Sequence, residues 1–149
     1  MPLHEREILP LARTFATGLK ARGNVLDNGI IYVTITTMVE IREYLGRAGR
    51  NPFRQWFDSL DSEASRKVTT SLYRMGLGNL SNVKSVGAGV YECKVNFGPG
   101  YRVYFGKEGE QIVILLGGGT KQRQQDSISL AMERWQDYKR RKKGQKEGE

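Results

Sequence analysis

Three basic residues in the second half of the chain are spaced so that their charges could surround one phosphate. Lys94 and Arg102 flank a Gly-Pro-Gly sequence that predicts a hairpin turn, and Lys121 follows a run of glycines. On a hairpin with a three-residue turn, Lys94 and Arg102 are diagonal neighbours on one face. Two cations this close repel each other unless they share an anion, such as a phosphate. The alternative is an ordinary solvated strand surface, on which Glu92 offsets the positive charge.

The alternation of side chains along this hairpin predicts which face is buried. The apolar positions expected in the core are Tyr91, Cys93, Val95, Phe97, Tyr101, Val103 and Phe105. The polar positions on the opposite face are Glu92, Lys94, Asn96, Arg102 and Tyr104. A three-residue turn pairs Asn96 with Arg102, Lys94 with Tyr104 and Cys93 with Phe105.

A further strand is expected after the hairpin, around residues 111–119. It is apolar on both faces and is predicted to lie inside the sheet. Its three final glycines predict close approach of the backbone to a ligand or a sharp reversal of the chain. Antiparallel pairing is expected to bring Lys121 beside Arg102. Val113 and Leu115 are expected on the face of Tyr104, where they form an apolar strip that needs a cover, either the last helix or another protein.

The elements that position these residues can be predicted from caps and periodicity. Asn51 and Pro52 predict the start of a helix with an apolar stripe, and Asp61 predicts the start of a second helix. Residues 39–45 predict a short strand, and residues 124–141 predict a helix with one apolar side. The fold class expected is α+β: a short first strand, a helical hairpin, a three-stranded antiparallel meander and a C-terminal helix.

The chain divides into three parts by composition. Residues 1–37 differ from the rest, with a weak helical pattern followed by a β-branched run, and are expected to be an appendage or to add a strand. Residues 38–143 are expected to form the main domain. The last residues, 144–149, are expected to be disordered.

Charge and composition limit the classes of function. Lysine and arginine number 24 against 16 acidic residues, a formal charge of +8 that favours a polyanionic partner such as nucleic acid. The single histidine, His4, leaves the main domain without imidazole for catalysis or metal binding, and no cofactor is expected. The lone cysteine, Cys93, is expected to be a buried, reduced thiol, which favours the cytoplasm. No apolar run approaches the roughly 18 to 20 residues of a membrane span, and no export signal is indicated.

The motif "YECKVNFGPGYRVYF", followed by "LLGGGTKQRQQD", resembles the RelE/ParE superfamily of toxins from bacterial type II toxin–antitoxin modules. The resemblance is to its HigB-like "addiction module killer" branch and covers residues 38–141. It includes the tryptophan-bearing helix "NPFRQWFDSLD". It implies a RelE-like fold and a toxin that cleaves messenger RNA without metal, usually in the ribosomal decoding site, and thereby inhibits translation.

The resemblance also implies roles for individual residues. Arg102 would bind the scissile phosphate, and Lys94 and Lys121 would share charge stabilisation and proton transfer. Glu92 departs from the family, since this position is basic in RelE itself, and Glu92 is the candidate for a substitute general base. The candidate residues for RNA binding are Tyr104, Asn96, Tyr101 and Arg123. The apolar strip of Val113, Leu115 and Tyr104 is the candidate surface for antitoxin binding.

Two other functions are compatible with the sequence. The first is a non-enzymatic toxin of the ParE kind, which poisons DNA gyrase by binding and has no need of the cations. The second is a basic RNA-binding module without catalysis. For a toxin, the implied partner is a cognate antitoxin, in this branch often a small helix-turn-helix protein.

Overall fold

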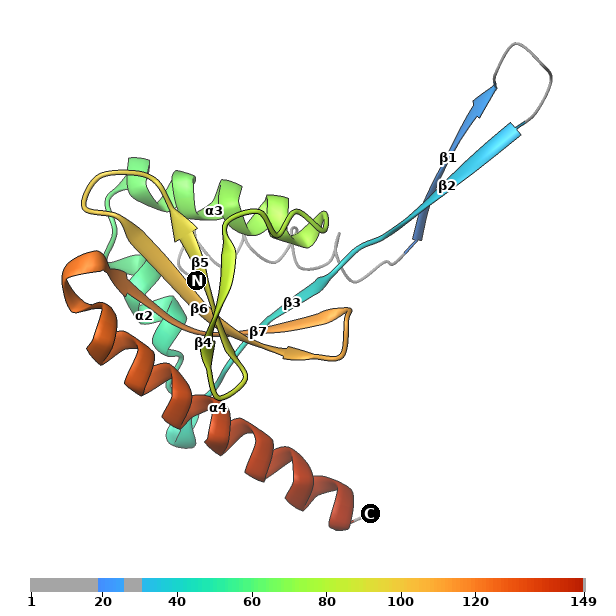
Figure 1. Cartoon of the computed structure of the whole chain (residues 1–149). Helices are drawn as coiled ribbons and strands as arrows, with labels where there is room; N and C mark the ends of the chain where they lie inside the picture. The colour runs from blue at the N-terminus through green and yellow to red at the C-terminus, as the bar shows by residue number, and fades with distance from the viewer. Residues whose placement is uncertain (1–18, 26–30, 149) are drawn as a thin grey trace.

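The main sheet has five strands and is mixed (Figure 1). The computed structural model describes the backbone of residues 19–25 and 31–148 and the side chains from residue 38 onwards. The strands are β3 (Glu40–Glu43), β4 (Val83–Gly87), β5 (Val90–Val95), β6 (Tyr101–Glu108) and β7 (Ile112–Thr120). They lie in the order β3-β7-β6-β5-β4, with β3 parallel to β7 and the other pairs antiparallel. The predicted α+β class is therefore confirmed, but the meander has an additional strand, β4.

Two helices, α2 (Pro52–Asp58) and α3 (Ser62–Gly76), cover one face of this sheet (Figure 1). Both begin at the predicted caps: Asn51 accepts a hydrogen bond from the Arg54 amide at 2.9 Å, and Asp61 accepts one from the Ala64 amide at 2.8 Å. The core between helices and sheet contains Phe53, Phe57, Val68, Met75, Cys93, Val95, Val103, Phe105, Val113 and Leu115. The apolar set predicted for the hairpin faces this core, with Tyr91, Phe97 and Tyr101 partly buried at its border.

The long helix α4 (Gln124–Glu147) covers the opposite face. A second core lies beneath it and is formed by Tyr44, Val90, Tyr104, Ile114, Leu116, Ala131 and Trp135. Trp135 lies so close to β6 that a Cβ atom on Gly106 would be 2.4 Å from its ring.

The helix α4 continues to Glu147, so the prediction of a disordered tail from residue 144 is wrong for residues 144–147. Hydrogen bonding within the helix and the ion pair from Lys142 to Glu108 on β6 account for the extra turns.

The β5–β6 register differs from the prediction by two residues. Lys94 lies directly opposite Arg102, and Glu92 lies opposite Tyr104. The connection contains five residues, 96–100, rather than three, because the Phe97 amide bonds to the Val95 carbonyl and closes the strand early. A shift of two keeps every side chain on its predicted face, since side chains alternate with a period of two.

The β6–β7 register places Val113 and Leu115 on the helical-hairpin side, away from Tyr104. Three residues, 109–111, separate the paired Glu108 and Ile112, so Leu115 pairs with Phe105. A β-bulge at Leu116 follows, and beyond it Gly117 pairs with Tyr104. The predicted apolar strip of Tyr104, Val113 and Leu115 is therefore wrong.

The N-terminal segment contributes a separate hairpin. Strands β1 (Leu19–Val25) and β2 (Ile31–Thr37) pair with each other in an antiparallel two-stranded sheet, which extends away from the main sheet in Figure 1. The β-branched run is thus a strand, but it does not join the five-stranded sheet. The weak helical pattern expected before residue 19 lies outside the described residues.

Candidate functional site

The buried carboxylate of Glu92 is the centre of a polar cluster on the α4 side of the sheet. Only 1% of Glu92 and 5% of Arg102 is exposed. Arg102 Nε donates to Glu92 Oε1 at 3.2 Å, and Gln124 Nε2 donates to Glu92 Oε2 at 2.8 Å. The exposed amine of Lys84 lies 3.7 Å from Oε1. Both carboxylate oxygens are therefore engaged within the protein.

Strand pairing and the first turn of α4 build this cluster. Lys84 on β4 lies opposite Glu92 on β5, while Arg102 on β6 lies one step along the same face. Gln124 is the first residue of α4 and closes over Glu92 from above the sheet. The sequence pattern identified Glu92 and Arg102. It missed Lys84, because β4 was not predicted, and it also missed Gln124.

The guanidinium of Arg102 is held at two points and retains one unbonded nitrogen. Its Nη1 donates to the Gly100 carbonyl at 3.2 Å, and that carbonyl also accepts the Lys121 amide at 2.9 Å. The described residues provide no hydrogen bond to Nη2. The predicted proximity of Lys121 to Arg102 is confirmed for the backbone.

The structure places the three predicted cationic residues at one end of the sheet but in different environments. Lys94 and Lys121 are exposed, whereas Arg102 is buried and already paired with Glu92. Lys94 is the direct cross-strand neighbour of Arg102, and Lys121 begins the 3-10 turn η2 (Lys121–Arg123). Two exposed amines therefore lie near one guanidinium that is held by hydrogen bonds within the protein.

The residues predicted to contact RNA are divided between two faces of the sheet. Asn96 and Arg123 are exposed near the cations. Tyr101 points to the helical-hairpin side, where its ring packs edge-on against Trp56 with centroids 6.2 Å apart. Tyr104 is fully buried beneath α4, so its predicted role in RNA binding is wrong.

Burial governs the chemistry of the Tyr104 hydroxyl. Desolvation, together with the charge of nearby Glu92, raises the pKa of Tyr104 far above its usual value. Its hydroxyl has no hydrogen-bond partner of normal geometry among the described residues. Tyr104 is therefore a neutral core residue at any physiological pH.

The predicted antitoxin-binding residues are not accessible. Val113 and Leu115 are buried in the core beneath α2 and α3, and Tyr104 is buried in the other core. The C-terminal helix covers Tyr104, and the helical hairpin covers Val113 and Leu115. None of the three residues is therefore available to a partner protein.

The three glycines at the end of β7 are explained by the helices on both sides of the sheet. A Cβ atom on Gly118 would lie 2.2 Å from the Trp56 ring, and one on Gly119 would lie 2.4 Å from Ser127 Oγ. Gly117 would similarly meet Arg134, whose Nη1 donates to the Leu116 carbonyl at 2.9 Å. The glycines thus admit side chains of α2 and α4, and not a ligand as the sequence suggested.

The Cys93 thiol is buried and unpaired, as predicted. Burial, with a smaller contribution from Glu92, raises the pKa of Cys93 from 9.0 to about 11. Between these values the unfolded chain releases the thiol proton while the folded chain keeps it, so stability is fully present below this window and falls as the pH rises through it.

We therefore expect Cys93 to react very slowly with a soluble disulfide reagent at neutral pH and to react readily once urea unfolds the chain. The measurement is the rate of thiolate release with and without urea. The Cys93→Ala variant should also lose less stability than the wild type between pH 9.0 and about 11. Rapid modification of the folded protein would show that β5 is more accessible than its burial indicates.

Within residues 38–148, no three His, Cys, Asp or Glu side chains come together as metal ligands. His4 lies outside the described residues. No helix in the described part of the chain is long and apolar enough to cross a membrane.

Comparison with known proteins shows a relative that is matched over most of its own length. No family model matches the chain. An uncharacterized protein of Haemophilus influenzae is 36% identical to it over 80 residues, which are 53% of this chain and 81% of that protein. The two chains belong to one family. Membership in the family of this H. influenzae protein assigns no activity to either chain.

Proposed function

We propose that the chain is the toxin of a type II toxin–antitoxin system and that it cleaves messenger RNA as a metal-independent endoribonuclease, with the ribosome providing part of the site. The observation that carries the proposal is the guanidinium of Arg102, whose Nη2 has no hydrogen-bond partner among the described residues, at the end of the sheet that also carries the exposed Lys94 and Lys121. The resemblance of this segment to RelE-like toxins supports it. A cognate antitoxin and a cytoplasmic location are parts of the same proposal.

In this proposal, Arg102 stabilises negative charge on the phosphate. Its guanidinium never deprotonates, and its position is fixed before substrate arrives, so no reorganisation is needed in the transition state. Lys94 and Lys121, whose side chains reach solvent, contribute charge and transfer protons to and from the ribose 2′-oxygen and the 5′-oxygen leaving group. Ribosomal RNA would fix the reacting geometry.

The structure favours a different role for Glu92 from the one first expected. Its two oxygens accept hydrogen bonds from Arg102 and Gln124, and its burial separates it from any substrate in solvent. We therefore assign Glu92 to positioning Arg102, and general base catalysis to one of the exposed lysines.

In a ribosome-containing translation assay, wild-type protein should shorten the messenger RNA, and the Lys94→Gln/Lys121→Gln variant should do so at least about 100-fold more slowly. Because both lysines are exposed, the variant should remain folded. The matched control is Arg66→Gln/Lys67→Gln on the exposed surface of α3, which removes the same charge and should cleave like the wild type. Intact message with folded wild-type protein would refute the nuclease proposal.

A ParE-like gyrase poison is the second candidate, and the buried Glu92–Arg102 pair is the observation that favours it. An arginine already paired inside the protein can serve stability without catalysis. This function would give gyrase-dependent DNA breaks with wild-type protein, undiminished in the Lys94→Gln/Lys121→Gln variant.

A further inference from the structure

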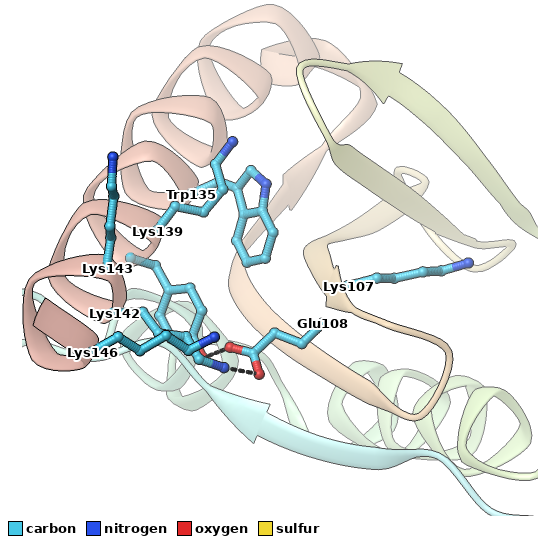
Figure 2. A pocket seen from close by; sticks show the side chains of 8 residues that line it. Lys107, Glu108, Trp135, Lys139, Lys142, Lys143 and Lys146 are labelled. Carbon is cyan, nitrogen blue, oxygen red and sulfur yellow. Dashed lines mark hydrogen bonds and ion pairs between the residues drawn. The ribbon is translucent and has the colours of Figure 1, made fainter. Parts of the chain in front are cut away.

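A lysine-walled cavity lies between the C-terminal half of α4 and the end of β6 (Figure 2). Its volume is about 330 Å³, and its lining residues are Lys107, Glu108, Trp135, Tyr138, Lys139, Lys142, Lys143 and Lys146. The α4 members recur at intervals of three and four residues, so they share one face of the helix. Lys139 is 15 residues beyond Gln124, or about 20 Å along the helix, so this cavity is separate from the Glu92 cluster.

The charges in this cavity are strongly unbalanced. Five lysines line it, and Glu108 is the single acidic residue. Glu108 already accepts hydrogen bonds from Lys142 and Tyr138, drawn as dashed lines in Figure 2. Burial alone would raise the pKa of Glu108, but these two bonds outweigh it and lower that pKa, so the carboxylate stays ionised and bound to its partners.

Three lysines on this face have no acidic partner. In the described part of the chain, no carboxylate lies within ion-pair distance of Lys139, Lys143 or Lys146. Lys107 is not counted among the lysines that could bind an anion in this cavity. Its amine points away from α4 in Figure 2 and lies 4.5 Å from the centre of the Tyr91 ring. Lys139, Lys143 and Lys146 are therefore the cations free to bind an anion.

The inner surface of the cavity is aromatic. The rings of Trp135 and Tyr138 stack with centroids 5.4 Å apart and planes at 9°. Lys139 lies 5.8 Å from the centre of the Trp135 ring. Burial and the bond to Glu108 raise the pKa of Tyr138 to about 12, so its ring is neutral at physiological pH. A volume of about 330 Å³ is at the low end of ligand pockets, which span roughly 300–1,000 Å³, and suits one flat ring system with its sugar.

We propose that this cavity binds single-stranded nucleic acid, with phosphates on Lys139, Lys143 and Lys146 and one base against the partly buried ring of Tyr138, which stacks on the buried Trp135. Free cations beside an aromatic surface are the combination that binds single strands without sequence preference. An acidic peptide would satisfy the lysines but would leave the aromatic surface unused. The inference does not depend on cleavage, because it concerns binding about 20 Å along α4 from Gln124, the residue that covers the Glu92 cluster.

The test measures binding of a fluorescein-labelled single-stranded deoxyribonucleotide oligomer, which lacks the 2′-hydroxyl needed for cleavage. The Lys139→Gln/Lys143→Gln/Lys146→Gln variant should bind about tenfold more weakly, and its slope of log affinity against log salt should fall by about 2, because each lost phosphate contact in a single strand contributes about 0.7. The control Arg66→Gln/Lys67→Gln/Arg74→Gln removes equal charge from α3 and should keep the wild-type slope.

A second variant tests the aromatic surface. Tyr138→Leu should weaken oligomer binding at least about fivefold, whereas Tyr138→Phe, which keeps the ring, should bind like the wild type. Equal losses in the α4 and α3 triple variants would overturn the proposal in favour of diffuse attraction. Preferential binding of an acidic peptide or an anionic vesicle by this face would also overturn it. Wild-type binding by the Lys94→Gln/Lys121→Gln variant would show that this site stands apart from the proposed nuclease function.

Discussion

The Glu92→Ala variant is expected to lose about 3–5 kcal/mol of unfolding free energy. The change leaves the guanidinium of Arg102 buried without its carboxylate, and it also removes the acceptor for Gln124 at the start of α4. Water cannot fully replace these bonds in the folded state, since Arg102 is buried and Gln124 is partly buried. The measurement is equilibrium unfolding in urea.

The matched control for Glu92→Ala is the double variant Glu92→Leu/Arg102→Met, which removes both charges and keeps the volume. Replacing a buried pair by apolar residues is often neutral, so this variant should lose much less stability than the single change. If Glu92→Ala costs less than about 1 kcal/mol, the pair does not organise the folded state and the positioning role assigned to Glu92 is wrong.

The Trp135→Ala variant is expected to lose a similar amount, about 3–5 kcal/mol. Trp135 fills the second core, and its indole covers Gly106 on β6 and Gly89 before β5. The sheet cannot fill the resulting cavity, because β6 offers only Gly106 at this point. The measurement is thermal or urea unfolding, followed by far-ultraviolet circular dichroism.

Leu130→Ala is the control for Trp135→Ala, since Leu130 lies on the same helix with an exposed side chain. It should change stability by no more than about 0.5 kcal/mol. Trp135→Phe should retain much of the packing. Equal small effects of Trp135→Ala and Leu130→Ala would mean that α4 is not anchored to the sheet.

Local signals in the sequence were sufficient to predict the helices and the faces of β5 and β6. Asn51 and Asp61 cap α2 and α3 as expected, because capping depends on residues only three positions apart. The buried set on β5 and β6 also follows from alternation, which survives a register shift of two. The stripe on α4 identified Trp135 as a core residue.

Features that depend on turn length were not predictable from these patterns. The connections at residues 96–100 and 109–111 set the registers of β6 and β7, and the first is two residues longer than the predicted turn. The bulge at Leu116 then moves Gly117 and Gly119 to the side of α4. Neither feature leaves a clear signal in composition or periodicity.

The candidate site was predicted in its residues but not in its internal bonding. Charge and spacing identified Lys94, Arg102 and Lys121, and the structure brings their backbones to one end of the sheet. An arginine on a strand can face solvent or a buried carboxylate. Which of the two occurs depends on the element that covers this part of the sheet, here the first residue of α4. The lysine-walled cavity was also missed, since the predicted helix ended at residue 141 and excluded Lys142, Lys143 and Lys146.

The two outer strands of the main sheet determine how it meets other copies of itself. On one border β3 has only four residues, and on the other β4 is interrupted after Ser85 and carries the exposed Lys84. Short, charged or irregular border strands give an incoming chain few unpaired backbone groups in line. The five-stranded sheet is therefore protected against edge-to-edge pairing with other copies of the chain.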